Sequence, residues 1–210
     1  MKILLADHHP VFRRGLKCML KGDKKFNFKG KVEDGRFLIS EIQKQKPDVL
    51  VLEIDLPNSN GVGILRQLKG HFPDLKVLVV SCHPEEIYAI SSIKAGANGY
   101  IAKTKSVKEV KNALLTVANG ENYISENIEQ RKSPDAQKAE VLKYKTLSTR
   151  EIEVLNLLSR GKRNKEIAQD LSINEKTVST YKTRLLKKLN VDNIAELIHQ
   201  SRLLQQNNTD

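Results

Sequence analysis

Short apolar runs and stretches of helical periodicity alternate along the first 125 residues. The runs VLVL at 49–52 and VLVV at 77–80 are typical of strands that are buried on both faces of a sheet. The stretches between such runs repeat their apolar residues at the spacing of an amphipathic helix. The pattern predicts strands at 3–6, 28–32, 49–54, 77–81 and 99–102, and helices at 11–21, 35–45, 63–71, 85–95 and 107–119.

Two of the predicted helices have a clear inner face. For 35–45 this face would consist of Leu38, Ile39 and Ile42. For 11–21 it would consist of Val11, Phe12, Gly15, Leu16 and Met19. Five strands that alternate with five helices predict an α/β doubly wound domain at 1–125, with a parallel sheet covered on both sides. In such a sheet the functional site lies beyond the carboxyl ends of the strands.

The remainder of the chain has a different pattern. Residues 126–146 are polar, dense in charge and include Pro134, so they predict a linker, with a helical stretch at 136–144. Residues 147–210 contain helical segments at 149–160, 164–171, 175–189 and 193–205. A short helix followed closely by a longer basic one is the helix-turn-helix pattern. We therefore predict a small all-α four-helix domain at 147–210.

The segment 175–189 has an apolar face and a basic face. Its amino end would be capped by Asn174, and its inner face would consist of Val178, Tyr181, Leu185 and Leu189. Hydroxyl groups contact base edges, and lysines contact phosphates. The residues expected to contact DNA are Lys176, Ser179, Thr180, Lys182, Thr183, Arg184, Lys187 and Lys188. A helical bundle with solvated lysines is the alternative on this pattern alone.

Charge and composition narrow the class of partner. The chain has 36 Lys and Arg against 25 Asp and Glu, a net charge of +11, which attracts polyanions such as DNA, RNA or an anionic membrane. Eight of the cations and three of the anions fall within 161–189, which favours DNA. No apolar run approaches the roughly 20 residues of a membrane helix, and the start MKILLAD has no secretory pattern.

The two cysteines and the lack of catalytic motifs indicate a cytoplasmic protein without enzyme activity. Cys18 and Cys82 lack metal-ligand spacing, so we expect two reduced thiols in a cytoplasmic protein. The sequence has no Ser-His-Asp set, no glycine-rich phosphate loop and no Cys/His cluster. We expect no enzyme activity.

A resemblance adds to this pattern in the C-terminal part. The segment LSTREIEVLNLLSRGKRNKEIAQDLSINEKTVSTYKTRLLKKLNV is similar to the LuxR-type helix-turn-helix over its full length. The resemblance implies that 175–189 enters the major groove and that Ser179, Thr180 and Thr183 contact bases. The family often has Lys where this chain has Ser179 and His where it has Tyr181, so a different sequence preference is expected.

The first 125 residues resemble the receiver domain of response regulators of the NarL/FixJ subfamily. The resemblance rests on ADHHPVFRRGL, PDVLVLEIDLPNSNG, VLVVS and AGANGYIAK. It implies a pocket with two acids after the first strand, a phospho-accepting aspartate after the third, a hydroxyl and a lysine. In such a pocket Mg²⁺ offsets the charge between the carboxylates and the incoming phosphate.

This sequence departs from that pocket at two positions. The residues at the family's pocket positions are Asp7, His8, Glu53, Ser81, Tyr100 and Lys103. His8 stands at the second acid position, and Glu53 stands at the phospho-accepting position. With His8 neutral the pocket sums to −1, whereas an intact pocket sums to −2, so we expect magnesium binding to be lost or weak and no cofactor to be bound. We also expect Glu53 to form an ion pair with Lys103.

Several alternatives remain open at this point. Glu53 either mimics the phosphorylated state or belongs to an inert pocket, and phosphorylation of Asp55 is a further alternative. A transition-metal site formed by Asp7, His8 and Glu53 is not expected, because adjacent residues at a strand end point different ways. His9 is expected to be structural, and isolated surface or cap positions are expected for His71, His83 and His199.

The sequence thus predicts a DNA-binding transcription regulator of the response-regulator type that is independent of aspartyl phosphorylation. It would bind an operator with two half-sites as a homodimer. RNA polymerase is a further candidate partner, whereas no sensor kinase and no membrane is expected to be one. The alternatives are a conventional phosphorylation-dependent regulator and a protein-binding adaptor that uses its helical domain.

Overall fold

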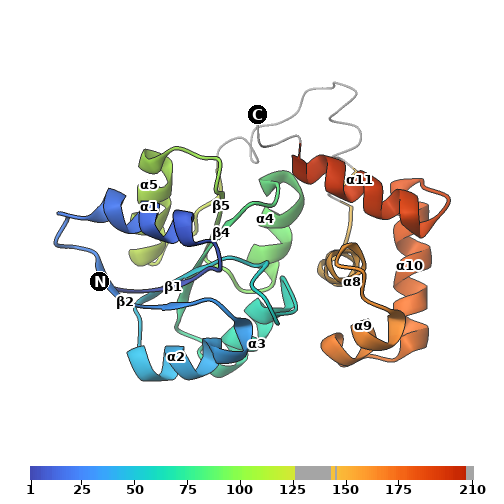
Figure 1. The fold of residues 1–210 in the computed structure, drawn as a ribbon, viewed down its shortest axis with the longest axis horizontal. Coiled ribbons are helices and arrows are strands. Elements are labelled where there is room, and N and C mark those ends of the chain that lie inside the picture. Colours follow the sequence, from blue (N-terminus) through green and yellow to red (C-terminus); the bar gives the residue numbers. More distant parts are fainter. Residues whose placement is uncertain (126–142, 145, 207–210) are drawn as a thin grey trace.

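A five-stranded parallel sheet forms the centre of the N-terminal domain (Figure 1). The computed structural model describes residues 1–125, 143, 144 and 146–206. The strand order is β2-β1-β3-β4-β5. The strands are β1 (Lys2–Ala6), β2 (Asn27–Val32), β3 (Val49–Leu52), β4 (Lys76–Ser81) and β5 (Gly99–Ala102). β1 and β3 flank the point where the strand order reverses, which is where such sheets bind ligands.

Helices cover both faces of the sheet. The helices are α1 (Pro10–Leu20), α2 (Leu38–Gln45), α3 (Gly63–His71), α4 (Glu85–Lys94) and α5 (Val107–Ala118), with a 3₁₀ turn η1 (Gly35–Phe37) before α2. Alternate strand residues point to opposite faces. Leu4 and Leu50 therefore share one core with Leu65 of α3, whereas Leu5 and Val51 share the other core with α1 and α5.

The inner face of α1 differs from the prediction. Leu16 is buried as expected, but Val11 is 82% exposed and Met19 is 39% exposed. The buried side chains of the helix are Arg13, Leu16 and Leu20. The helix is turned so that the Arg13 guanidinium reaches the Asp7 carbonyl, to which it donates a hydrogen bond of 2.6 Å. The prediction placed an apolar face where a buried cation anchors the helix to the loop after β1.

The C-terminal domain consists of α8 (Thr149–Ser159), α9 (Asn164–Leu171), α10 (Glu175–Leu189) and α11 (Ile194–Gln206). α8 begins with a capping box formed by Ser148 and Glu151. The residues that cap the carboxyl ends of α9 and α10 are Ser172 and Asn190, both in the left-handed region. The predicted fold class, a doubly wound α/β domain with a four-helix helix-turn-helix domain, is confirmed.

The predicted linker at 126–146, with its helical stretch at 136–144, lies almost entirely outside the described residues. None of the helices in the described part of the chain has the length and apolar character that a membrane span requires.

Candidate receiver pocket and DNA-binding face

The pocket residues come together at the carboxyl ends of four strands. Asp7 follows β1, Glu53 follows β3, Ser81 ends β4, and Lys103 follows β5. β3 ends at Leu52 rather than at residue 54 as predicted, so the Glu53 side chain belongs to the edge of the sheet. Asp7, Glu53 and Ser81 are nearly inaccessible to solvent.

Both carboxylate oxygens of Glu53 are engaged. Oε1 accepts hydrogen bonds from Ser81 Oγ at 2.5 Å and from the Asp55 amide at 3.0 Å. Oε2 lies 3.1 Å from Lys103 Nζ and accepts a weaker bond of 3.3 Å from the Cys82 amide. The expected ion pair between Glu53 and Lys103 is therefore present, and Glu53 has four polar partners.

The Lys103 ammonium lies between two carboxylates. It forms an ion pair with Asp7 as well as with Glu53. Its Nζ is also 4.4 Å from the centre of the Phe12 ring, which adds a cation–π contact. Opposite charges that are buried together stabilise the fold only when each is paired. In this pocket the protein's own cation pairs with both acids and offsets one of their two charges.

His8 and His9 lie next to Asp7 in the pocket. The His9 amide and ring Nδ1 lie 2.6 Å and 3.0 Å from Asp7 Oδ1, and the same Nδ1 lies 2.9 Å from Lys103 Nζ. The rings of His8 and His9 are 3.9 Å apart. Burial lowers the pKa of His8 below its usual value. Apart from its place next to Asp7 and His8, no pattern in the sequence points to His9 as part of the pocket.

Tyr100 points inward on β5 and is fully buried. Its hydroxyl donates to the His83 carbonyl at 3.0 Å, and burial raises its pKa. The His83 ring stacks on Tyr88 at 4.6 Å, and burial lowers the His83 pKa. The prediction that His83 is an isolated surface or cap residue is wrong, because it links Tyr100 to α4.

Contacts across the domain boundary begin at this edge of the sheet. The Tyr88 hydroxyl donates to Asn156 Oδ1 at 2.5 Å, and Asp55 forms an ion pair with Arg160 at the end of α8. Arg160 also donates to the Ser59 carbonyl at 3.0 Å. Since the Asp55 amide binds Glu53, one residue connects the pocket carboxylate to the helix-turn-helix domain.

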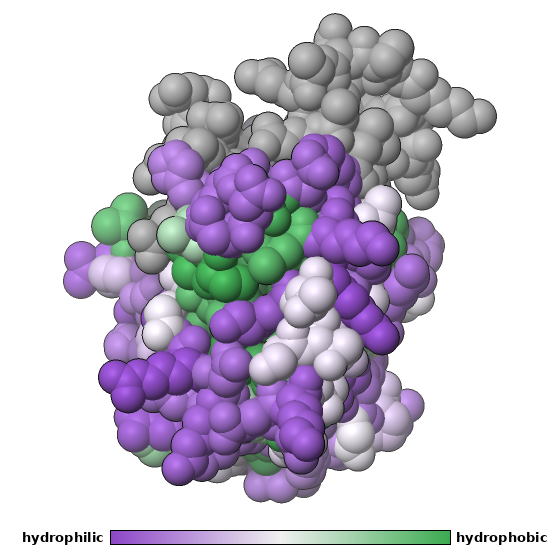
Figure 2. All heavy atoms as spheres, turned by 90° about the vertical axis from the view of Figure 1, so that its right-hand side faces the viewer, coloured by the Kyte–Doolittle hydropathy of each residue, from purple (hydrophilic) through white to green (hydrophobic). Residues whose placement is uncertain are grey.

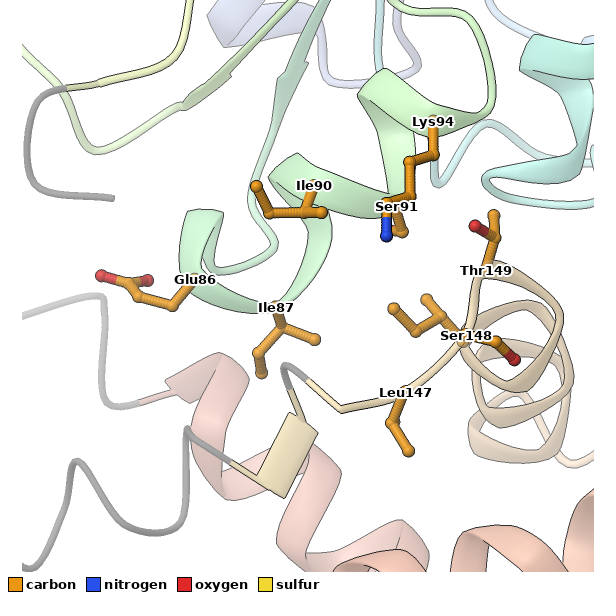
Figure 3. A pocket seen from close by; sticks show the side chains of 9 residues that line it. Glu86, Ile87, Ile90, Ser91, Lys94, Leu147, Ser148 and Thr149 are labelled. Carbon is orange, nitrogen blue, oxygen red and sulfur yellow. The ribbon is translucent and has the colours of Figure 1, made fainter. Parts of the chain in front are cut away.

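A second contact between the domains involves a buried acid. Glu153 of α8 is fully buried, lies 2.7 Å from Arg66 of α3 and 3.0 Å from Arg150. Burial raises the pKa of Glu153, and the two arginines oppose this shift. Nearby, a pocket of about 350 Å³ lies between α4 and the start of α8, with Ile87, Ile90 and Leu147 among its lining side chains (Figure 3).

The side of α10 away from its buried apolar residues faces solvent. As predicted, Asn174 caps the helix by accepting a bond from the Lys176 amide at 2.8 Å. Val178, Leu185 and Leu189 are buried, and Tyr181 packs partly buried against the core. The exposed residues of α10 that were predicted to contact DNA are Lys176, Ser179, Thr180, Thr183, Arg184, Lys187 and Lys188. The surface on this side of the molecule is mostly hydrophilic, with a hydrophobic area in its upper part (Figure 2).

Two predicted phosphate contacts have partners inside the protein. Lys182 Nζ donates to Asn164 Oδ1 at 3.1 Å, and Lys188 Nζ lies 2.7 Å from Glu151 Oε2. The Lys188 ammonium also donates to the Thr146 carbonyl at 3.1 Å. Lys188 therefore ties α10 to the start of α8.

Comparisons with known proteins agree with both domains. Residues 3–115 match the family described as response regulator receiver domain, and residues 145–201 match bacterial regulatory proteins of the luxR family. This chain is a response regulator with a LuxR-type helix-turn-helix. It is 33% identical to the transcriptional regulatory protein DegU of Brevibacillus brevis, over 96% of this chain and 92% of DegU. It is 31% identical to the oxygen regulatory protein NreC of Staphylococcus epidermidis, over 94% of this chain and 95% of NreC.

Solved structures resemble this response regulator over both domains. RcsB from Salmonella enterica serovar Typhimurium, bound to promoter rprA in the presence of the phosphomimetic BeF₃⁻, superposes with a TM-score of 0.83. The two proteins are 25% identical, and the match covers 96% of this chain and 98% of RcsB. The chain is thus a DNA-binding transcription regulator of the response-regulator type and not an enzyme, and the adaptor alternative is not supported.

Proposed function

We propose that this response regulator binds an operator of two half-sites as a homodimer, and that its receiver domain acts without aspartyl phosphorylation. The independence from phosphorylation rests on one observation. The Lys103 ammonium pairs with both Asp7 and Glu53. Glu53 stands where the resemblance implies the phospho-accepting aspartate. The lysine and the hydroxyl of the pocket are both bound to the Glu53 carboxylate.

Magnesium has little to bind in such a pocket. It takes hard oxygen ligands in near-octahedral geometry, and phosphoryl transfer needs a cation between the carboxylate and the phosphate. His8 supplies no such oxygen, and the carboxylates of Asp7 and Glu53 already share a cation. We therefore expect Mg²⁺ binding to be weak and phosphoryl transfer to Glu53 to be negligible.

Glu53 acts in this proposal as a fixed substitute for a regulated group. It draws Ser81 and Lys103 towards one carboxylate, and through the Asp55 amide it supports the Asp55–Arg160 ion pair. The superposition with promoter-bound RcsB supports a domain arrangement that is compatible with DNA binding. The receiver would therefore hold the helix-turn-helix domain in one arrangement.

The DNA-contacting half of the proposal rests on α10. Ser179, Thr180 and Thr183 are exposed on one side of this helix, and Lys176 and Lys187 lie beside them. A structure described as two RcsB dimers bound to two parallel DNAs superposes with a TM-score of 0.77 and 26% identity. This likeness supports a dimer in which two copies of α10 read paired half-sites.

Incubation with acetyl phosphate and Mg²⁺, followed by intact-mass measurement and DNA titration, tests the proposal. We expect no gain of a phosphoryl group and the same operator affinity before and after incubation. The E53D variant, which restores the family's residue, is the matched comparison. A stable phosphoryl gain on the natural chain, lost in E53Q or in D55N, would establish a conventional phospho-switch instead.

The E53Q variant separates the two roles that Glu53 could have. If the carboxylate holds the domain arrangement, E53Q lowers operator affinity, because the amide forms no ion pair with Lys103. Unchanged affinity in a folded E53Q protein would mean that the pocket is inert and that only phosphorylation-independence stands.

A further inference from the structure

Three metal-ligating side chains meet at the entrance of the pocket. Asp7, His8 and His9 each offer one ligand atom, and these atoms all lie within 4.8 Å of one another. Asp7 is buried, and the two histidines are partly buried. Within the described part of the chain, this is the one group of three such residues.

The backbone explains why three consecutive residues converge. β1 ends at Ala6, and His9 is the residue that precedes the first turn of α1. The chain therefore turns between Asp7 and His9, and the alternation of a strand no longer separates their side chains. The His9 amide donates to Asp7 Oδ1 at 2.6 Å and fixes this turn. Adjacent side chains point apart only within a strand, so the expectation that they cannot converge does not hold for Asp7, His8 and His9.

The His8 ring has one nitrogen without a partner in the part of the chain that the structure describes. The buried Nδ1 of His8 has no hydrogen-bond partner among the described residues. A buried polar atom without a partner costs free energy unless it binds a ligand, a water or an ion. The centres of the His8 and His9 rings are 3.9 Å apart, and one nitrogen of each ring lies within 4.8 Å of the other.

We infer that Asp7, His8 and His9 form a site for a borderline divalent transition ion of the Zn²⁺ or Co²⁺ kind. Imidazole nitrogens suit Zn²⁺, Ni²⁺ and Cu²⁺, whereas Mg²⁺ prefers oxygen ligands. Zinc holds nitrogen ligands at about 2.0–2.1 Å, so two ligands of one tetrahedral ion are about 3.4 Å apart. The observed ligand atoms lie within 4.8 Å of one another, so binding requires them to move closer to that spacing.

The ion competes with Lys103 in this site. The Lys103 ammonium is paired with Asp7 and lies 2.9 Å from His9 Nδ1, so it occupies one side of the ligand group. Binding of a dication moves the ammonium away from Asp7 and leaves it with Glu53, its other carboxylate. The site thus couples metal binding to the Lys103–Glu53 pair, which goes beyond a receiver that merely lacks phosphorylation.

Titration with Co²⁺ tests the inference, because tetrahedral Co²⁺ gives visible absorption bands when imidazole binds it. With the full chain we expect one Co²⁺ per chain, displaced by Zn²⁺ and not by Mg²⁺ at the same concentration. H8A and H9A should each weaken binding by at least about tenfold, since even the loss of an outer-shell partner costs about 10–100-fold. H71A and H199A, which alter exposed histidines elsewhere, should leave binding unchanged.

A variant expected to increase Co²⁺ affinity distinguishes a loss of ligands from a loss of folding. K103A removes the competing ammonium, so we expect it to bind Co²⁺ more tightly than the natural chain. The inference is overturned if the natural chain gives no imidazole-type absorption bands, if H8A and H9A bind as well as the natural chain, or if K103A binds more weakly while it remains folded by circular dichroism. None of these outcomes decides whether acetyl phosphate modifies the protein.

Discussion

The receiver pocket and the exposed side of α10 are both rich in charge, but they leave that charge in different states. In the pocket, Lys103 pairs with Asp7 and Glu53 at an almost inaccessible site. On α10, Lys176, Arg184 and Lys187 are exposed and form no ion pair with any residue that the structure describes. Paired charges need no partner from outside, whereas a row of unpaired cations attracts a polyanion.

The difference also separates two kinds of control. We propose that the pocket, whose groups are paired with one another, responds little to phosphate or magnesium. We expect the α10 surface to respond to salt and to DNA sequence, because its exposed cations have no ion-pair partner among the described residues. The contacts of Asp55 and Glu153 with the other domain connect the two regions.

The largest expected effect is on the salt dependence of DNA binding. A dimer brings two copies of the unpaired cations of α10 to the phosphates, about six contacts in all. Affinity for an operator fragment should therefore fall by about 10³-fold between 50 and 200 mM salt. Fluorescence anisotropy at several salt concentrations measures this slope. K187A should make the slope shallower, and an affinity independent of salt would contradict this role of α10.

A smaller effect is expected from the pocket itself. E53Q keeps the shape of the side chain but leaves Ser81 and Lys103 without the carboxylate, while Asp7 still pairs with the lysine. We expect the free energy of unfolding to fall by about 1–3 kcal/mol. Denaturant unfolding measures the change. E121Q, at an exposed position, should change it by no more than about 0.5 kcal/mol, and an equally small change for E53Q would mean that the network contributes nothing.

A still smaller effect is expected for a base contact. The Thr183 hydroxyl donates to the Ser179 carbonyl at 3.2 Å, so its oxygen remains free to accept a bond from a base. T183A should weaken binding to the preferred operator by about fivefold, equivalent to about 1 kcal/mol, and reduce the discrimination between operators. K187A should instead weaken binding to all sequences alike. Equal losses on every sequence for T183A would remove Thr183 from the base-reading set.

Periodicity and local chemistry account for what the sequence could predict. The order of strands and helices, the Asn174 cap and the Glu53–Lys103 pair all follow from neighbouring residues or from positions with a known counterpart. The face of α1 could not be predicted, because it is set by the hydrogen bond of Arg13 to a backbone carbonyl. The Asp55–Arg160 pair joins residues 105 positions apart, and no pattern along the chain specifies such a contact between surface charges.

The last expected effect is a pH dependence that starts beside the pocket. Burial lowers the pKa of His83 below the value of about 6.5 that it has in the unfolded chain. Above pH 6.5 both states are neutral, and below it the unfolded chain binds the proton more readily. Stability should therefore fall as the pH drops from 6.5 towards the folded pKa, by no more than about 1.4 kcal/mol per pH unit for this one proton.

Substitution of His83 removes this contribution and tests it. H83Q has no titrating ring, so its unfolding free energy should decline less steeply between pH 7 and pH 5 than that of the natural chain. H71Q, at an exposed histidine, should follow the natural chain. His8 has a pKa shifted in the same direction by burial, so part of the decline should remain in H83Q and disappear in the H8Q/H83Q double variant. Parallel curves for the natural chain and the double variant would mean that acid destabilisation arises elsewhere, for example where Glu151 accepts its bond from Lys188.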